Sequence, residues 1–413
     1  MIHSPTRRPW LSERSRAGAR QAALALACAL LASCASPPSA VTSRAPAPVA
    51  PTAAPSASPA ASEPLTGTGL RLQPASFADL PGWQADDFTN VWSAWLQDCR
   101  APLPQLVEAC TAARGVAADD IAAQRAFFEQ WFQPWQTAGA NGQDQGLVTG
   151  YYEPVLRGSR TRGWPYVVPV YGLPDDLLPR ADAPDGVTRG RVAWSNGRKE
   201  LLPYWSRAQV SADPQALAAL GRNVVAWLDS PVDALFLQVQ GSGLVELPDG
   251  HMLRLSYAGD NGWPYKSVGR WLLEQGQLRG TVTMQIIRAW AQMHPNRLSQ
   301  MLDANPRMVF FRATPLEHPA RGPTGAMGVP LTPMRSVAVD KRLLRLGTPL
   351  WLATTVAGQP FARLVFAQDV GGAITGSLRA DLYFGTGDAA GDAAGRMQSS
   401  GRMWVLLPRG VAP

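Results

Sequence analysis

Residues 363–385 read RLVFAQDVGGAITGSLRADLYFG, and this stretch decides the prediction of the fold. A short apolar run leads into Asp369, the pair Gly371 and Gly372 then interrupts the chain, and a second run follows. In the second run apolar and polar side chains alternate, which is typical of a half-buried strand and puts Asp381 on its polar face. Strands disfavour aspartate, so this carboxylate has either a solvated side chain or a function, and the residues alone leave both open.

Several other segments are more specific than this alternation. They are VDKR at 339–342, LGTPL at 346–350, GLVTGYYEP at 146–154, QVQGSG at 238–243 and SYAG at 256–259. Together with 363–385 they resemble the MltA-type lytic transglycosylases, whose C-terminal module is named for three aspartates. By position these would be Asp340, Asp369 and Asp381. The resemblance covers nearly everything from about residue 76 to residue 408.

The resemblance implies a mainly β fold, in which a six-stranded double-psi β-barrel domain carries an inserted smaller β-barrel domain and a few flanking helices. We expect residues 66–154 and 319–410 to form the barrel catalytic domain, with the three-aspartate module at about 330–407. Residues 155–318 would form the inserted β domain, the other wall of a glycan-binding groove. A length of 413 residues agrees with two domains after processing.

The N-terminal end predicts export. Five arginines precede an apolar run at 22–31 that is too short to span a membrane, so residues 1–33 indicate a lipoprotein signal peptide. Cys34 would be lipidated, the alternative being ordinary secretory cleavage near Ala35. The residue after Cys34 is not aspartate, which favours the outer membrane of a Gram-negative cell, facing the periplasm. Residues 34–65 are rich in Ala, Pro and Ser, and we expect a disordered tether there.

Two cysteines remain after Cys28 leaves with the signal peptide and Cys34 takes the lipid. In an oxidising compartment Cys99 and Cys110 are expected to form a disulfide, and two separate buried thiols are the alternative. The formal net charge of +7 favours an acidic partner, which could be nucleic acid, anionic lipid or an anionic glycan.

Helical spacing predicts a first helix from residues 86–87, with an aromatic stripe facing the core, and a second after residues 119–120. A helical pair is expected over 286–302. The folded part is predicted to open near Ser76. Residues 166–171, 234–240 and 308–312 have strand-like composition. If 234–240 is a strand, Gln238 and Gln240 share a face, and the glycines that follow bring the backbone close to a ligand.

The chemistry left by elimination is carboxylate chemistry. The sequence has no HExxH pair, GxSxG elbow, P-loop or Rossmann glycine pattern, and we expect no metal and no cofactor. The resemblance implies that Asp381 first protonates the leaving oxygen and then deprotonates the C6 hydroxyl of N-acetylmuramic acid. Asp369 would support it by raising its pKa, if the glycine turns fold the strands side by side. We rank Asp340 as structural and expect Arg379 to turn outward, because pairing with Asp381 would lower the pKa of the acid.

The resemblance further implies a peptidoglycan lytic exotransglycosylase, a lyase that cleaves the β-1,4 bond between N-acetylmuramic acid and N-acetylglucosamine and leaves 1,6-anhydro ends. The residues themselves leave endo or exo cleavage open. We expect a monomer bound to glycan strands and, through Cys34, to the outer membrane, with a cell-wall synthesis or degradation complex as a candidate partner and no nucleic acid. The candidate substrate contacts are Tyr152, Glu153, Gln240, Gly241, Ser242, Gly371 and Gly372.

Two alternatives belong to other classes. A glycoside hydrolase on the same fold would need a second carboxylate at the scissile bond, for which Glu153 and Asp369 are the candidates. A peptidoglycan-binding lipoprotein without catalytic activity would use Asp381 only to hydrogen-bond sugar.

Overall fold

The computed structural model describes residues 65–195 and 197–411. The predicted signal peptide, the lipidation site Cys34 and all but the last residue of the predicted tether lie outside these residues. Within the described part of the chain, no helix is both long and apolar enough to cross a bilayer.

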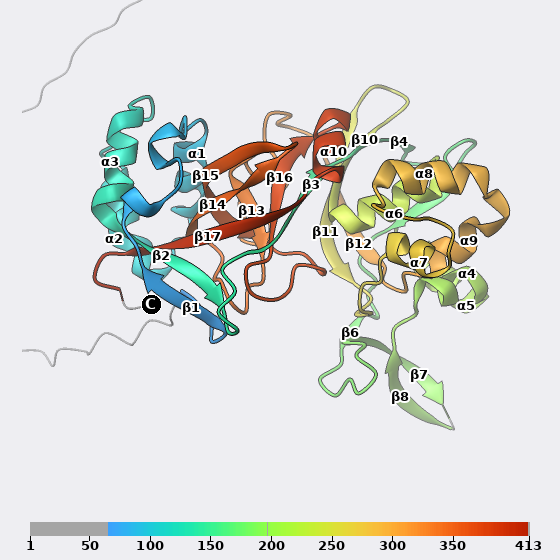
Figure 1. The fold of residues 1–413 in the computed structure, drawn as a ribbon. Helices are drawn as coiled ribbons and strands as arrows, with labels where there is room; N and C mark the ends of the chain where they lie inside the picture. The colour runs from blue at the N-terminus through green and yellow to red at the C-terminus, as the bar shows by residue number, and fades with distance from the viewer. Residues whose placement is uncertain (1–64, 196, 412–413) are drawn as a thin grey trace, which may run out of the picture. The chain divides into compact units, whose positions relative to one another are not determined.

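The fold contains a closed six-stranded β-barrel, which is formed mainly by the C-terminal strands (Figure 1). Its strands are β3 (Gly146–Glu153), β13 (Ser336–Val339), β14 (Pro349–Val356), β15 (Gln359–Asp369), β16 (Ala380–Thr386) and β17 (Gln398–Pro408). Around the barrel the order is β17, β14, β15, β13, β16 and β3, and β3 pairs back with β17. The β13–β15 and β16–β3 pairs are parallel and the others are antiparallel. The prediction of a mainly β barrel fold is confirmed.

The predicted alternation of apolar and polar residues around Asp381 places the apolar side chains of β16 in the core of the barrel. Ala380 and Leu382 of β16 are fully buried inside, together with apolar residues of the other five strands. Strand β16 begins at Ala380, after a turn in which Leu378 has a φ of 60°. Helix α10 (Asp388–Gly395) follows β16 and packs on β3 and β16.

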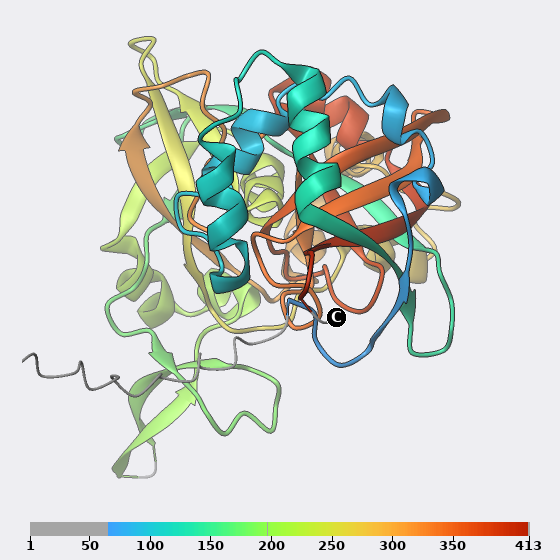
Figure 2. The ribbon, with the colours of Figure 1, turned by 90° about the vertical axis from the view of Figure 1, so that its left-hand side faces the viewer.

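Three helices, α1 (Val91–Asp98), α2 (Val107–Ala113) and α3 (Ile121–Trp131), cover one side of the barrel (Figure 2). Their buried aromatic side chains, among them Trp92 and Trp95, pack on the outward faces of β14, β15 and β17, as the helical spacing predicts. The disulfide between Cys99 and Cys110 joins the segment after α1 to α2. The chain also forms a strand pair, β1 (Leu70–Pro74) with β2 (Phe132–Gly139), that extends the sheet beyond β17, so the fold opens before Ser76.

Helix α1 begins at Val91, later than predicted, because Asp86 has another role. Its buried carboxylate receives two hydrogen bonds of 2.7 Å from the guanidinium of Arg335, which is itself fully buried, and a third from the backbone N–H of Leu364. A bidentate pair of this kind is strong and directional. It therefore attaches the segment before α1 to the start of β13 and to β15.

A second, open six-stranded sheet forms half of a smaller barrel. In sheet order its strands are β12 (Val309–Pro315), β11 (Met252–Asp260), β10 (Ser242–Glu246), β4 (Val155–Ser159), β9 (Val224–Leu228) and β5 (Val168–Tyr171). Helices pack around it: α4 (Arg207–Ala212), α5 (Pro214–Gly221), α6 (Pro231–Gln240), α7 (Val268–Glu274), α8 (Met284–Met293) and α9 (Leu298–Asp303). The predicted helical pair at 286–302 is confirmed by α8 and α9.

The prediction of a strand over residues 234–240 is wrong, because these residues lie in helix α6. Ser230 caps the helix by accepting the N–H of Asp233, Pro231 occupies the first turn, and Gly241 ends it with a φ of 81°. These are strong start and stop signals for a helix. Leu235 and Leu237 are fully buried, so the apolar run packs a helix into the second sheet and its neighbours.

A small three-stranded sheet joins β6 (Leu178–Pro179), β7 (Arg189–Ser195) and β8 (Arg198–Pro203). It projects away from the second sheet in both ribbon views (Figures 1 and 2).

Candidate active site

Asp369 and Asp381 lie on strands that are not neighbours in the sheet, because a third strand, which the sequence patterns did not predict there, lies between them. The two aspartates lie on β15 and β16, and β13 separates these strands. In the ladder registers both residues are partners of Ala338, Asp369 in the parallel pair and Asp381 in the antiparallel pair. The glycine turns therefore do not fold β15 against β16, as expected, but they do bring the two carboxylates to the same level of the barrel.

Asp381 is held by a hydroxyl from the neighbouring strand. Thr149 is its register partner on β3, and the Thr149 hydroxyl donates to Oδ1 of Asp381 at 2.5 Å. Arg379 donates to the Thr149 oxygen at 2.8 Å, so the single hydroxyl hydrogen is left to point at Asp381. Among the described residues none donates to Oδ2 of Asp381.

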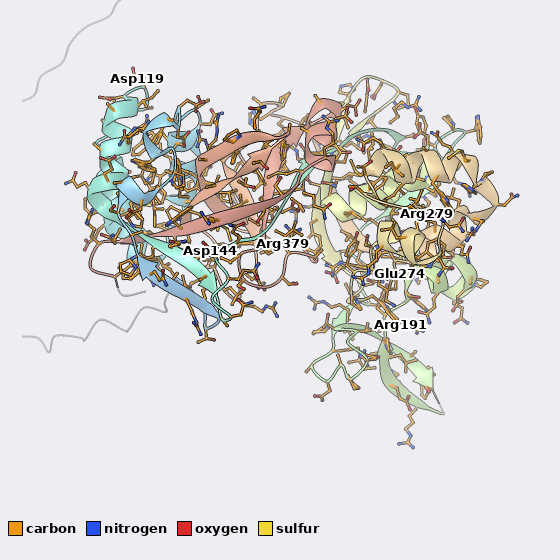
Figure 3. The ribbon with its side chains drawn as sticks, viewed as in Figure 1. Asp119, Asp144, Arg191, Glu274, Arg279 and Arg379 are labelled. Carbon is orange, nitrogen blue, oxygen red and sulfur yellow. A yellow bond between two sulfur atoms is a disulfide. The ribbon has the colours of Figure 1, made fainter. Side chains whose placement is uncertain are left out.

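Arg379 does not turn outward, so that prediction is wrong. Its guanidinium is half-buried and also donates to the carbonyl oxygens of Leu147 and Ala380 (Figure 3 labels Arg379). These carbonyls and the Thr149 oxygen are acceptors that an outward side chain would forgo. The arginine therefore acts on Asp381 across a bridging hydroxyl instead of through a direct ion pair.

Burial raises the pKa of Asp381 to about 6. The hydrogen bond from Thr149 and the positive charge of Arg379 oppose this rise, and the negative charge of Asp369 adds to it. Desolvation is thus the main cause and the neighbouring aspartate a minor one. A carboxyl group with this pKa is partly protonated near neutral pH, as a general acid must be.

Asp369 has donors on both oxygens. Its Oδ1 accepts the backbone N–H groups of Ala326 and Val370, each at 2.9 Å, and its Oδ2 accepts the hydroxyl of Tyr151 at 2.9 Å. Burial raises the pKa of Asp369, and these three donors oppose the rise. The ring of Tyr151 packs on that of Tyr383, with centroids 5.3 Å apart, which fixes the hydroxyl in place.

Asp340 lies directly after β13 and outside this pair. It accepts the backbone N–H of Gly376 at 2.8 Å and both the N–H and the guanidinium of Arg342. The hydrogen bond from the Arg342 side chain, with the two backbone donors, lowers its pKa to about 2. An acid that stays ionised and joins two turns agrees with the structural role expected for it.

Tyr152 points away from the two aspartates. Its ring contacts α10 at Gly391 and lines a hollow of about 190 Å³ that is also bordered by Asp233, Arg288 and Asp388. Asp381 and Asp369 do not line this hollow. Tyr151, and not Tyr152, therefore contacts one of the two aspartates, and the role of Tyr152 as a substrate contact stays a prediction.

Glu153 is fully buried, so it cannot contact a substrate in this conformation. Its Oε1 and Oε2 accept hydrogen bonds from Nε and Nη2 of Arg254 at 3.0 and 3.2 Å, and the Thr386 hydroxyl also donates to Oε2. Because Arg254 lies on β11 and Glu153 ends β3, the ion pair joins the second sheet to the barrel. Such a buried charge needs its partner, which explains the acidic residue without any substrate.

The two glutamines of α6 have structural contacts as well. Gln240 accepts the backbone N–H of Tyr152 at 3.0 Å, and Gln238 accepts from Arg207 and from the N–H of Val309. Gly241 and Ser242, which follow, are half-buried at the start of β10.

The Gly371 and Gly372 turn meets the second sheet. A Cβ atom at Gly371 would lie 2.5 Å from Cγ1 of Ile374, so no larger residue fits there. A Cβ atom at Gly372 would lie 3.3 Å from Cζ of Arg307, whose guanidinium donates to Asp260 at 2.8 Å. The turn after Asp369 and a charged pair of the second sheet are therefore close neighbours.

Sequence reasoning did not assign roles to Thr149, Tyr151 and Arg307. The first two lie in the quoted segment at 146–154, where the strand period puts residues 149 and 151 on one face. That period was the available signal. For Arg307 we find no local signal, since its partner Asp260 lies 47 positions away.

Comparison with known proteins gives consistent matches. The family model of the MltA specific insert domain matches residues 147–312, and that of the 3D domain matches residues 335–407. Membrane-bound lytic murein transglycosylase A of Escherichia coli K12 is 35% identical over 282 residues, which cover 66% of this chain and 68% of the relative. The crystal structure of MltA from Neisseria gonorrhoeae is 33% identical, covers 85% of this chain and 97% of that one, and superposes with a TM-score of 0.71. The structure of E. coli MltA with bound chitohexaose is 28% identical, covers 85% and 100%, and has a TM-score of 0.62.

Proposed function

Since the chain belongs to the MltA family of membrane-bound lytic murein transglycosylases, we propose that it cleaves peptidoglycan between N-acetylmuramic acid and N-acetylglucosamine without consuming water. The observation that carries this proposal is Asp381. Burial raises its pKa to about 6, one of its oxygens has no donor among the described residues, and the two candidates for a second carboxylate, Asp369 and Glu153, are already held by hydrogen bonds.

In the first step protonated Asp381 gives its proton to the glycosidic oxygen as the bond to the anomeric carbon breaks. The Thr149 hydroxyl donates to Oδ1, so the acidic proton resides on Oδ2, where no described group competes for it. Before the reaction the nearby negative charge of Asp369 favours the protonated form of Asp381. During bond cleavage the same charge stabilises the positive charge that develops on the sugar.

In the second step ionised Asp381 accepts the proton of the muramic acid C6 hydroxyl. The hydroxyl oxygen forms a bond to the anomeric carbon of the same sugar and closes the 1,6-anhydro ring. Asp381 ends the cycle protonated, so the acid and the base are one residue. The products are a lyase's products, since no water is added.

The occupied oxygens of the other two acids argue against a hydrolase. An inverting or retaining hydrolase needs a second carboxylate as base or nucleophile. Asp369 has three donors on its two oxygens, and Glu153 is buried against Arg254. Three of about four acceptor sites of Asp369 are therefore occupied, and Glu153 is not accessible to water or sugar in this conformation.

For the substrate we propose a glycan strand that runs past Asp381 between the barrel, residues 66–154 and 319–410, and the inserted domain, residues 155–318. The Gly371 and Gly372 turn, with Arg307 opposite, supports this path. A related structure contains bound chitohexaose, which is a β-1,4-linked chain of N-acetylglucosamine. Exolytic cleavage and a lipid on Cys34 that anchors the protein to the outer membrane remain parts of this proposal.

The test is mass spectrometry of the products released from purified peptidoglycan. The chain from residue 35 onward should release fragments one water lighter than hydrolysis products, and Asp381→Asn should release none. Asp79→Asn, a change at an exposed carboxylate that lies outside the barrel strands, is the matched control and should cleave like the parent. Free reducing ends would make the protein a hydrolase, and full activity of Asp381→Asn would remove the catalytic assignment.

A further inference from the structure

The small sheet β6–β7–β8 presents an apolar face to solvent. Its registers pair Val192 with Leu201 and Trp194 with Lys199, so these four side chains lie on one face, and Leu178 joins them from β6. We call these five residues the hairpin face. Trp194 is 71% exposed and Val192 53%, and the other two apolar members are exposed as well.

The reverse face has the opposite character. Arg191, Ala193 and Leu202 are half-buried, and the guanidinium of Arg191 lies 4.0 Å from the ring centroid of Trp205 (Figure 3 labels Arg191). Exposed and half-buried residues alternate over residues 191–195 of β7, which shows that Val192 and Trp194 point outward from a regular strand. Four large apolar side chains exposed together mark an interaction surface.

The charge around this face is positive. Lys199 lies directly across from Trp194, and Arg198, whose register partner Ser195 lies on the reverse face, is exposed at the end of β8 beside the turn. The one acid of the two longer strands, Glu200, is paired with Ala193 on the reverse face. A partner that matches the hairpin face therefore offers an apolar layer for the four apolar side chains and negative charge above that layer for Lys199.

The dimensions favour a lipid surface over a protein. The small sheet has only three short strands and projects away from the second sheet (Figures 1 and 2), whereas a stable protein interface takes about 800 Å² from each partner. A bilayer needs only a few inserted side chains, tryptophan prefers its headgroup region, and each basic residue adds attraction to anionic lipid. Reversible docking of this kind suits a second contact beside a lipid anchor.

We propose that the hairpin face docks on an anionic phospholipid bilayer, with Trp194 at headgroup level, Lys199 against the lipid phosphates and Arg198 beside them at the strand end. This surface contains none of the proposed catalytic residues, and the docking goes beyond the cleavage reaction.

The test is co-sedimentation of the chain from residue 35 onward with vesicles. This form lacks Cys34 and retains every described residue. The parent should bind vesicles of phosphatidylcholine with phosphatidylglycerol, and Trp194→Glu should lower the apparent affinity by about tenfold or more. Arg198→Gln with Lys199→Gln should weaken binding to the anionic vesicles only. Trp164→Glu is the matched control, because Trp164 is 89% exposed and lies outside the small sheet.

Three results would overturn the proposal. They are no binding of the parent to anionic vesicles, equal losses in Trp194→Glu and Trp164→Glu, and concentration-dependent self-association that Trp194→Glu abolishes while vesicles have no effect. Product release from peptidoglycan by Trp194→Glu at the parental rate shows that the variant is folded. If the parent itself releases no product, the proposed function fails, while the vesicle result still decides the docking.

Discussion

Replacing Asp381 by asparagine should stabilise the folded chain, and the stabilisation should grow with pH. Burial raises the pKa of Asp381 from 3.8 to about 6, so the folded state holds its proton more tightly than the unfolded state. The ionised side chain then costs about 3 kcal/mol of folding free energy at pH 8. At pH 4 the folded state is protonated and the unfolded state about half ionised, and the cost is about 0.5 kcal/mol. Asparagine cannot ionise and avoids this cost.

The assay is urea unfolding of the parent and of Asp381→Asn at pH 4 and pH 8, with the disulfide intact. The difference in unfolding free energy between the two proteins should rise by about 2.5 kcal/mol from the lower to the higher pH. Any pH-independent effect of the substitution cancels in this comparison. Titrating groups that do not interact with Asp381 are common to both proteins and cancel too.

Asp340→Asn is the matched control. Hydrogen bonds from Arg342 lower the pKa of Asp340 to about 2, so its contribution is present above its unfolded pKa and is lost only as the pH falls toward 2. The control variant should therefore be destabilised almost equally at pH 4 and pH 8. If Asp381→Asn behaves like the control, with no gain between the two pH values, the burial of Asp381 does not raise its pKa and the reasoning fails.

Three further predictions concern the hydrogen bonds around Asp381 and the ion pair between Glu153 and Arg254. The rate of peptidoglycan cleavage by the parent, followed by turbidity, should fall about tenfold per pH unit well above pH 6, because the acid must be protonated, and a flat profile to pH 8 would contradict this. Thr149→Val removes a hydrogen bond that lowers the pKa of Asp381, so the alkaline limb should move to higher pH; an unmoved limb would show that the hydroxyl does not tune the acid. Arg254→Ala leaves Glu153 buried and unpaired, and urea unfolding should show a loss of roughly 3–5 kcal/mol, part of which Glu153→Gln in the same chain recovers. Strictly additive losses in the double variant would rule out the pairing.

Local patterns predicted much of this molecule. The alternation around Asp381 located a barrel strand, and helical spacing located α3, α8 and α9, because each pattern reports which side chains a single element buries. The resemblance brought together three acids that lie far apart in the sequence. What neither gave was the order of strands. The separation of Asp369 from Asp381 by Ala338 depends on β13, which lies ahead of both in the chain.

The errors have physical causes. The mainly apolar stretch of seven residues at 234–240 fits either a strand or a helix, and the cap signals at Ser230 and Pro231, which decide between them, lie outside this stretch. Arg379 was judged against its neighbour in the same strand, yet its position depends on Thr149, a residue 230 positions away. The burial of Glu153 likewise depends on a partner 101 positions away.

Strand β3 and strand β4 are one length of backbone, interrupted by Pro154 alone, whose carbonyl oxygen accepts the N–H of Leu244 in the second sheet. The strand that supplies Thr149 to the acid thus continues as a strand of the opposite sheet. A displacement of either sheet relative to the other would therefore move this shared backbone segment. We therefore expect a displacement of the second sheet to shift Thr149 and, with it, the hydrogen bond that lowers the pKa of Asp381.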